Sequence, residues 1–241
     1  MEKETAQEIL DLSQKEYDEF ASEFSESRQI FWEELKFLKE YAQKGDRILD
    51  IGCGNGRLSD LFKNEGMEYT GIDFSEKLIK IAKEERGKNG KFIQANALDL
   101  PFENNSFDTI FSIAVLHHTP SKENRMRFIF EANRVLKPGG VCVLTVWNTL
   151  NRKFAKAHMA HFLKKISGNS DLDFGDIIIP FGKQKRQRYI HSFTKISLRG
   201  LFEKNYFSNI SVQNIKRKSG HANLVVVAQK KRKSTKDFDE K

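Results

Sequence analysis

The stretch Arg47-Ile48-Leu49-Asp50-Ile51-Gly52-Cys53-Gly54-Asn55-Gly56 decides the fold of this 241-residue chain. Its apolar first half predicts a buried strand, and its second half predicts a loop with glycine at every second position. Glycine allows a sharp turn and lets a ligand lie directly against the main chain. Residues 57–62 continue with helical spacing, and a helix start offers free N–H groups to an anionic ligand. The stretch therefore predicts a strand–loop–helix unit that binds a ligand.

A second strand-like run, residues 69–73, ends at Asp73, which lies 19 positions after Gly54. A carboxylate at the tip of the second strand, at about this distance from a glycine loop, can accept hydrogen bonds from both hydroxyls of a ribose. The spacing here is Gly-x-Gly-x-Gly, which differs from the Gly-x-Gly-x-x-Gly of dinucleotide binders. A flavin or nicotinamide enzyme and a glycine turn without a ligand remain alternatives, but Asp73 favours a nucleoside-containing ligand of another kind.

The pattern Asp-x-Gly-x-Gly-x-Gly, here Asp50 to Gly56, resembles the first motif of class I S-adenosylmethionine-dependent methyltransferases. This resemblance implies an α/β, Rossmann-like fold with a seven-stranded, mostly parallel sheet, helices on both faces and an antiparallel C-terminal strand. It also implies S-adenosyl-L-methionine as the cofactor. The residues expected to bind it are Tyr17, Arg28, Asp50, Gly52, Gly54, Asn55, Gly56, Asp73, Phe74, Asn96, Ala97 and Ile113.

From residue 47 the chain alternates strand-like and helical patterns, as in a parallel sheet covered on both faces. Strands are predicted over residues 48–51, 69–73, 91–95, 107–114, 141–147, 206–212 and 224–228, and helices over 75–88, 124–136, 154–166 and 192–203. The helix predicted over 124–136 is expected to end at a turn formed by Lys137-Pro138-Gly139-Gly140. Ligands of such sheets lie at the carboxyl ends of the strands, so the site is expected there.

The length predicts one methyltransferase domain over residues 1–229, followed by a charged, disordered tail over 230–241. Apolar residues at three- and four-residue steps predict an N-terminal helical lid over about 5–41, divided at Ser25-Glu26-Ser27. Residues 150–190 break the strand–helix rhythm and are rich in lysine and arginine. We expect them to form a basic insertion on the substrate side.

Charge is distributed unevenly along the chain. Residues 151–241 hold 21 Lys and Arg and 7 Asp and Glu, which leaves 20 basic and 26 acidic residues for 1–150. A solvated lysine-rich surface explains this asymmetry less well than a surface that binds a polyanion. The expected phosphate-contacting residues are Arg152, Lys153, Lys164, Lys165, Lys183–Arg188 and Lys216-Arg217-Lys218.

Two further observations bear on location. The apolar runs are too short to span a bilayer, and the acidic, polar start does not predict a signal peptide, so no membrane is expected as a partner. Cys53 and Cys142 lack metal-ligand spacing, and no metal site is expected. Two cysteines without a disulfide pattern are typical of the reducing cytosol, which predicts a cytoplasmic protein.

Three other motifs carry a more specific resemblance. They are Phe24-Ser25-Glu26-Ser27-Arg28, Ile113-Ala114-Val115-Leu116-His117-His118 and Arg188-Tyr189-Ile190-His191. Together with Arg134–Gly140 and Val146-Trp147, they resemble the tRNA wobble-uridine methyltransferases, which esterify carboxymethyluridine at the first anticodon position. The resemblance covers roughly residues 17–200.

The resemblance implies the catalytic and acceptor-binding residues His117, Arg28, Arg188, Tyr189 and His191, with His117 favoured over His118 as a pocket-lining side chain. It implies two partners, the anticodon loop of tRNA and a small zinc-binding activator protein along the sheet edge. The chain departs from the family's pattern at Ser27, Asn96, Asn148 and Phe181, and its end lacks the family's tryptophan.

Two other functions stay open from the sequence. One is a small-molecule methyltransferase of the quinone or polyketide type, which shares the glycine and Pro-Gly-Gly motifs. The other is a non-catalytic RNA-binding relative that keeps the fold. The charge asymmetry disfavours the first, and the intact glycine loop with Asp73 disfavours the second.

Overall fold

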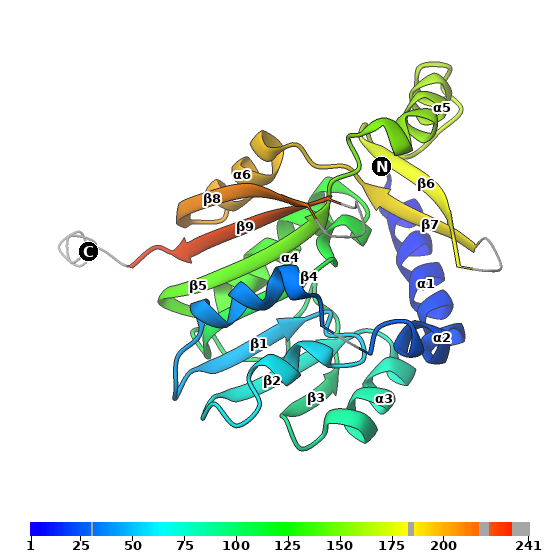
Figure 1. The fold of residues 1–241 in the computed structure, drawn as a ribbon. Coiled ribbons are helices and arrows are strands. Elements are labelled where there is room, and N and C mark those ends of the chain that lie inside the picture. The colour runs from blue at the N-terminus through cyan, green and yellow to red at the C-terminus, as the bar shows by residue number, and fades with distance from the viewer. Residues whose placement is uncertain (30, 183–185, 217–221, 233–241) are drawn as a thin grey trace.

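A seven-stranded sheet forms the centre of the protein in the computed structural model, which describes residues 1–29, 31–182, 186–216 and 222–232. The strand order is β3-β2-β1-β4-β5-β9-β8 (Figure 1). Neighbouring strands among β1 to β5 pair in parallel, and β9 pairs antiparallel with both β5 and β8, which confirms the predicted fold class. The strands are β1 (Arg47–Ile51), β2 (Glu68–Asp73), β3 (Lys91–Gln94), β4 (Phe107–Ile113), β5 (Leu136–Trp147), β8 (Phe207–Lys216) and β9 (Ala222–Lys230).

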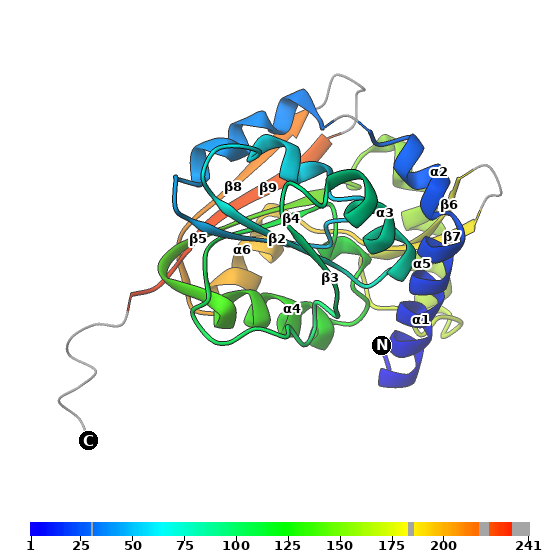
Figure 2. The same ribbon diagram turned by 90° about the horizontal axis from the view of Figure 1, so that it is seen from below.

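Helices cover both faces of this sheet, because its central strands are apolar on both sides. In β1, Ile48 belongs to one hydrophobic cluster, and Leu49 and Ile51 belong to the other, all fully buried. The first cluster includes residues of α3 (Glu76–Arg86) and of the 3-10 helix η1 (Glu33–Tyr41); the second includes residues of α4 (Lys122–Val135) and α6 (Lys195–Glu203). Figure 2 shows the sheet between these two layers.

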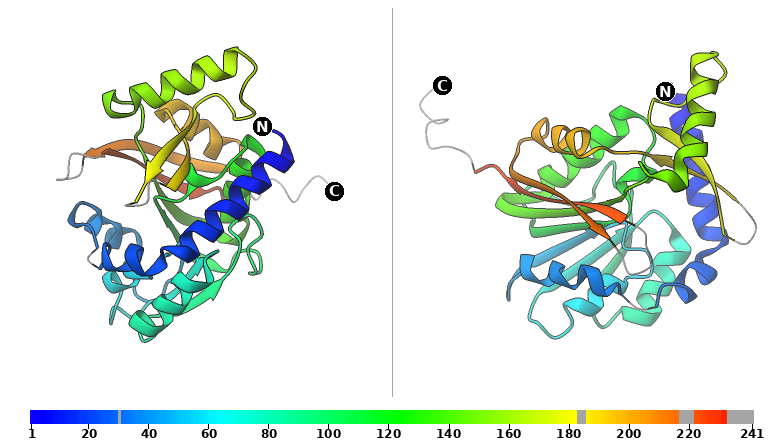
Figure 3. Two further views of the ribbon diagram at one scale, coloured as in Figure 1. Left: turned by 90° about the vertical axis from the view of Figure 1, so that its right-hand side faces the viewer. Right: turned by 45° about the horizontal axis from the view of Figure 1, so that its top comes forward.

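The N-terminal lid is shorter than predicted. It consists of α1 (Lys3–Glu19) and α2 (Ala21–Glu26), so the helical segment ends within the predicted break at Ser25-Glu26-Ser27, and an additional break follows Glu19. The segment Glu33–Tyr41 is not part of the lid, because Leu35 and Leu38 are buried against the sheet. Figure 3 shows α1 passing beside β7, and the end of α1 also contacts the start of α3, where Asp18 accepts a hydrogen bond from Ser75.

The apolar spacing of α1 does not mark a core face. Ala6 is its one fully buried residue, and Leu12 is half exposed. The reason is that α1 lies over a cavity and not on the sheet, so several of the side chains it turns inward are polar. The 3.6-residue pattern correctly predicted a helix, but it did not predict what the apolar side of that helix packs against.

Three local predictions differ from the structure. The segment 57–62, which has helical spacing, forms a short 3-10 helix, η2 (Arg57–Leu61), and not the start of an α-helix. The Lys137–Gly140 segment lies in β5, because Leu136 already pairs with Phe107 of β4, so α4 ends at Val135. Lys230 ends β9 and donates hydrogen bonds from Nζ to backbone carbonyls, including that of Leu136 at 2.7 Å, whereas the predicted tail from residue 233 on lies outside the described residues.

The predicted insertion forms a small unit of its own at one end of the sheet. It contains η4 (Arg152–Phe154), α5 (Ala155–Ile166) and an antiparallel pair, β6 (Asp176–Phe181) and β7 (Arg186–His191) (Figure 3). The sequence analysis did not predict this second sheet. Within the described ranges, every helix is too short or too polar to cross a bilayer.

Candidate active site

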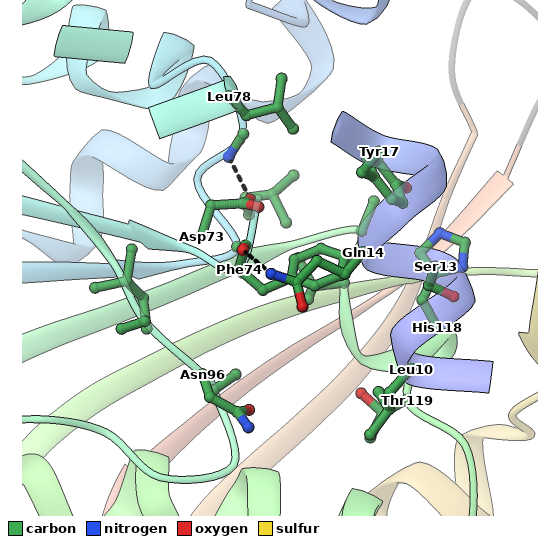
Figure 4. A pocket seen from close by; sticks show the side chains of 18 of the residues that line it. Leu10, Ser13, Gln14, Tyr17, Asp73, Phe74, Leu78, Asn96, His118 and Thr119 are labelled. Carbon is green, nitrogen blue, oxygen red and sulfur yellow. Dashed lines mark hydrogen bonds between the residues drawn. The ribbon is translucent and has the colours of Figure 1, made fainter. Parts of the chain in front are cut away.

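A cavity of about 470 Å³ lies between α1 and the carboxyl ends of the parallel strands, the position expected for a ligand of such a sheet (Figure 4). Its volume lies in the range of small-molecule sites. Ten of the predicted site residues line it: Tyr17, Arg28, Gly52, Gly54, Asp73, Phe74, Asn96, Ala97, Ile113 and Arg188.

The glycine loop brings bare backbone to this cavity. Gly52 has φ +76°, and a Cβ there would lie 2.4 Å from a methyl carbon of Val115. Gly54 has φ +57°, and a Cβ there would lie 3.2 Å from the ring of Phe24 in α2. Positive φ and close packing both require glycine at these two positions. The loop can therefore touch a ligand with its main chain, as the sequence predicts.

Asp73 lies at the tip of β2 with both carboxylate oxygens tied to the backbone. Oδ2 accepts a hydrogen bond from the Gly54 N–H at 2.8 Å, and Oδ1 accepts one from the Ser75 N–H at 3.0 Å. Each carboxylate oxygen can accept a second hydrogen bond, so both remain able to bind a ligand hydroxyl. Burial raises the pKa of Asp73 to about 6, although these two hydrogen bonds favour the charged form. The side chain is thus held rigidly on the cavity wall.

The lid is bonded to the wall beside Asp73. Nε2 of Gln14 in α1 donates to the carbonyl of Phe74 at 2.9 Å (Figure 4). The hydroxyl of Ser75 donates to Asp18 of α1 at 2.6 Å. Further along the wall, Oδ1 of Asn96 accepts from the Leu98 N–H at 2.9 Å. That oxygen keeps one lone pair for a ligand, so the predicted contact between Asn96 and an adenine amino group remains possible.

Three predicted cofactor residues do not line the cavity. Asp50 is buried behind the loop and accepts a hydrogen bond from the Tyr69 hydroxyl; burial raises its pKa to about 7. Asn55 is buried and donates from Nδ2 to Ser25 and to the carbonyl of Arg28, which ties the loop to the lid. Gly56 precedes η2 and packs against the ring of Phe92. These residues support the loop and do not face the cavity.

Two arginines lie on another part of the wall. Arg188 of β7 is 6% exposed, and its guanidinium carbon lies 3.0 Å from the ring centroid of Phe181 and 5.2 Å from that of Tyr17. Its Nη2 is buried and has no hydrogen-bond partner among the described residues. Arg28 stacks on Phe24 at 4.2 Å and donates to Ser27. A buried cation with an unused donor on a cavity wall indicates a place for an anion.

The two adjacent histidines have exchanged the roles that the sequence analysis gave them. His117 is fully buried and does not line the cavity, because its ring stacks between His118 and Trp147 at centroid distances of 4.1 and 5.0 Å. His118 lines the cavity, and its Nδ1 lies 3.0 Å from the carbonyl of Tyr189. Burial lowers the pKa of His117 well below its usual value and that of His118 to about 3, so both rings are neutral.

Tyr189 and His191 also lie outside the cavity wall. Both bind the buried carboxylate of Asp176: the Tyr189 hydroxyl donates to it at 2.8 Å, and Nδ1 of His191 lies 2.6 Å from it. Nη1 of Arg125 in α4 adds a hydrogen bond to the Tyr189 hydroxyl at 3.2 Å. This network fixes β6 and β7 to the domain, so the two residues position β7 and do not face the cavity.

The basic segment Lys183–Arg188 was predicted to contact phosphates, but the two arginines that the structure describes in it contact the lid or are buried. Lys183–Lys185 lie outside the described residues. Arg186 stacks on Phe20 at 5.5 Å and lies 3.9 Å from Glu19, so it contacts the lid. Arg188 is buried. Of the predicted phosphate-contacting residues that the structure describes, those left exposed are Arg152, Lys153, Lys164 and Lys216, whereas Arg217 and Lys218 lie outside the described residues.

The sequence analysis missed part of the wall. Gln7, Leu10 and Gln14 of α1 line it, as do Trp32 and Arg57, which stack on each other at 4.3 Å. The α1 residues are spaced by three and four and continue to Tyr17, which was the available signal. Across the described residues, no cluster of His, Cys, Asp or Glu could hold a metal ion.

The fold agrees with the family and the solved structures that this chain resembles. Residues 49–144 match the family described as methyltransferase domain. A solved S-adenosylmethionine-dependent methyltransferase from Methanosarcina mazei superposes with a TM-score of 0.70 at 26% identity, covering 85% of this chain and all of the other. A putative methyltransferase solved in complex with the Haloferax volcanii Trm112 methyltransferase activator gives a TM-score of 0.64 at 16% identity, covering 92% and 98%.

The chain therefore contains a methyltransferase domain of the class I fold that uses S-adenosylmethionine as its cofactor. In sequence it is similar to the tRNA (carboxymethyluridine(34)-5-O)-methyltransferase of Arabidopsis thaliana, with 39% identity over 131 residues, or 54% of this chain and 31% of the relative. The chain spans less than a third of the length of the tRNA methyltransferases with which it aligns first.

Proposed function

We propose that this protein transfers the methyl group of S-adenosylmethionine to the carboxylate of a carboxymethyluridine in the anticodon loop of tRNA, at the wobble position. The observation that carries the proposal is Arg188, a buried cation with an unpartnered donor on the wall of the cofactor cavity. The similarity to the Arabidopsis enzyme supports the choice of acceptor. A methyl ester on the uridine is the expected product.

On the donor side, this chain would supply Asp73 for the ribose hydroxyls and the bare backbone of Gly52 and Gly54 for close contact. Asn96 and Phe74 would flank the adenine ring. The bound cofactor supplies an electrophilic methyl group on a sulfonium. The protein's contribution is position and exclusion of water, and α1 provides the cover.

On the acceptor side, Arg188 and Arg28 would hold the carboxylate. A carboxylate with a reference pKa of roughly 4 is ionised at neutral pH, so the acceptor needs no general base. The site agrees with this, because burial lowers the pKa of His118 to about 3, so its neutral ring cannot accept a further proton at neutral pH. The rings of Phe181 and Tyr17 stabilise the guanidinium of Arg188 by cation–π contact and do not pair it with a carboxylate.

The RNA would approach over the insertion. Its helix α5 and the preceding η4 carry exposed Arg152, Lys153, Lys156 and Lys164 and no acidic residue. Such cations contact phosphates without reading sequence, and a single-stranded loop can turn a base out into a pocket. A basic surface that serves only solubility would bind RNA weakly. The salt dependence of tRNA binding, described in the Discussion, distinguishes this alternative from a phosphate-binding surface.

Two other assignments follow from the same observations. A small anionic molecule would also fit the arginines, which keeps a small-molecule methyltransferase as the second candidate. An activator subunit is a proposal as well; a protein of the same fold was solved with the Trm112 activator. We propose that the chain acts in the cytoplasm, where such tRNA would be met.

The test is methyl transfer from labelled S-adenosylmethionine to bulk tRNA, with and without an added activator of the Trm112 kind, followed by mild alkali. Label that enters tRNA and is released by alkali is the expected result, because esters hydrolyse there. Label that survives alkali would move the acceptor to nitrogen, carbon or a ribose oxygen. Absence of label in tRNA under both conditions, with donor binding intact, would favour the small-molecule candidate.

A further inference from the structure

His118 has a hydrogen-bonding pattern that the proposed function does not use. Its Nδ1 lies 3.0 Å from the backbone carbonyl of Tyr189. A carbonyl oxygen can only accept, so Nδ1 must carry the proton. In a neutral imidazole the other nitrogen, Nε2, then has a lone pair and no proton.

The surroundings of the ring preserve this state. Burial and the guanidinium of Arg188 are the two largest causes that hold the pKa of His118 at about 3, and the guanidinium of Arg28 adds to them. The titratable groups whose rings face it are Tyr17 at 6.4 Å and His117 at 4.1 Å, which stays neutral as well. Trp147 packs on a further side at 5.7 Å. No carboxylate is hydrogen-bonded to the ring among the described residues.

The ring also has an open side. His118 is partly exposed and lines the cavity (Figure 4), and Nε2 has no hydrogen-bond partner among the described residues. A lone pair on a cavity wall repels a carboxylate and attracts an N–H or O–H group. The same wall therefore combines a cationic part at Arg28 and Arg188 with a hydrogen-bond acceptor at His118.

We propose that His118 determines which acceptor is used, by accepting at Nε2 a hydrogen bond from a ring N–H of the substrate while Arg28 and Arg188 bind its anionic group. The substrate class is then a heterocycle that carries both an anion and an N–H donor. This inference rests on the proposed function, in which that donor is N3–H of the uracil ring. A cytosine-like ring, with a lone pair at the same position, would place two acceptors against each other and be rejected.

The backbone of β7 acts in the same interaction. The carbonyl of Tyr189 holds His118, and the Tyr189 hydroxyl and His191 fix this part of β7 on Asp176. Asp176, Tyr189 and His191 are thus positioning residues for the ring and not catalytic residues. This explains why Tyr189 and His191 lie off the cavity wall while Arg188, in the same motif, lines it.

The first test compares two synthetic anticodon hairpins, one with 5-carboxymethyluridine and one with its N3-methyl derivative, as acceptors for the full chain with its activator. Losing the N–H should lower kcat/KM roughly 10- to 100-fold, the effect of one hydrogen bond and a misplaced methyl. In His118→Leu the two hairpins should become equivalent. In His118→Gln, whose amide oxygen can accept, the preference should persist.

A matched control is His161→Gln in α5, where the ring binds a backbone carbonyl outside the cavity; its preference should equal that of the unaltered protein. Equal methylation of both hairpins by the unaltered protein would overturn the role of His118 and leave the proposed function standing. Methylation of neither hairpin would overturn the proposed function, and this inference with it.

The second test reads the ring directly. In the histidine-15N-labelled full chain, long-range proton–nitrogen spectra should show His118 with a protonated Nδ1 and an unprotonated Nε2, and this pattern should not change between pH 8 and 5. The resonance is assigned by its loss in His118→Gln. A protonated Nε2, or a ring that titrates in this range, would overturn the inference without reference to catalysis.

Discussion

The part of the cavity wall that is proposed to hold the methyl donor (the donor part) and the part proposed to hold the acceptor (the acceptor part) are built in different ways. The donor part comes from one continuous strand–loop–strand unit, with Gly52, Gly54 and Asp73 presenting main chain and a carboxylate. The acceptor part is assembled from residues 17, 28, 118, 147 and 188, which come from five separate elements or loops. Locally encoded sites can be recognised from spacing, whereas assembled sites depend on how distant elements pack. The two parts should therefore respond to different substitutions.

The largest effect is expected from Asp73→Ala. Removing the carboxylate deletes two charge-assisted hydrogen bonds to the donor's ribose, which should weaken S-adenosylmethionine binding roughly 100-fold or more. Isothermal titration calorimetry measures this, and a thermal melt checks that the variant folds. Asp99→Ala, at a side chain that is 87% exposed, is the control and should bind normally. Affinity within threefold of the unaltered protein would refute the placement of the ribose.

The next effect separates the two parts. Arg188→Met keeps an apolar stem among the aromatic rings but removes the cation, so kcat/KM for tRNA should fall roughly 10- to 100-fold while the donor's Kd stays within twofold. Arg188→Lys should not restore activity, because an ammonium lacks the planar fork. Arg47→Met, which starts β1 at the amino end of the sheet, is the control. A matching loss of donor affinity in Arg188→Met would show that the two parts are not separate.

A pH dependence is expected in the donor part. Because burial raises the pKa of Asp73 to about 6, the free protein protonates this residue as the pH falls below 6, and the protonated form accepts hydroxyls poorly. The donor's Kd should therefore be constant above pH 7 and rise about tenfold for each further pH unit well below 6. Calorimetry from pH 5 to 8 measures the change.

The variant Asp50→Asn removes a second buried carboxyl near the glycine loop, whose pKa is raised to about 7. If Asp73 is responsible, the fall in affinity below pH 6 remains in this variant. If the fall disappears, Asp50 controls donor binding through the loop, and the assignment to Asp73 is wrong.

The smallest effect concerns the RNA surface. Replacing exposed Lys156 and Lys164 of α5 with alanine should reduce the slope of log K against log salt by about 1 for each lysine. Arg186→Ala should leave the slope unchanged, because that side chain contacts Glu19 and Phe20 of the lid. Filter binding with tRNA at salt concentrations between about 50 and 200 mM measures these slopes. The reverse result would place the RNA beside β7.

Much of the fold followed from the sequence because its signals are local. The apolar runs at Ile48–Ile51 and 69–73 had to be buried on both faces, and the glycine spacing had to form a loop at their carboxyl ends. The helix predicted over 75–88 is α3, and the first residue of the predicted range, Ser75, caps it: its hydroxyl accepts from the Leu78 N–H at 3.2 Å. The long helix at the N-terminus was also predicted, but not where it ends.

The errors share one physical cause, which is that spacing does not record what an element packs against. Helix α1 has apolar residues at helical steps, yet it covers a cavity and leaves Leu12 exposed. The turn predicted at Lys137–Gly140 is a bulge within β5, because Leu136 before it pairs with Phe107 of β4 and Val141 after it pairs with Thr109. The exchange between His117 and His118 depends on which ring Trp147 covers and which one the Tyr189 carbonyl reaches.

The sequence by itself determined the class of the protein, the donor loop and the position of Asp73, because each depends on residues close together in the chain and on backbone conformations that glycine alone adopts readily. The tertiary structure alone decided that Arg188 is buried with an unused donor, that His118 lines the cavity with Nδ1 on the Tyr189 carbonyl, and that Tyr189 and His191 hold β7 in place. Those properties depend on hydrogen bonds and burial between segments up to 171 positions apart, such as Tyr17 and Arg188, and only the folded packing brings them together.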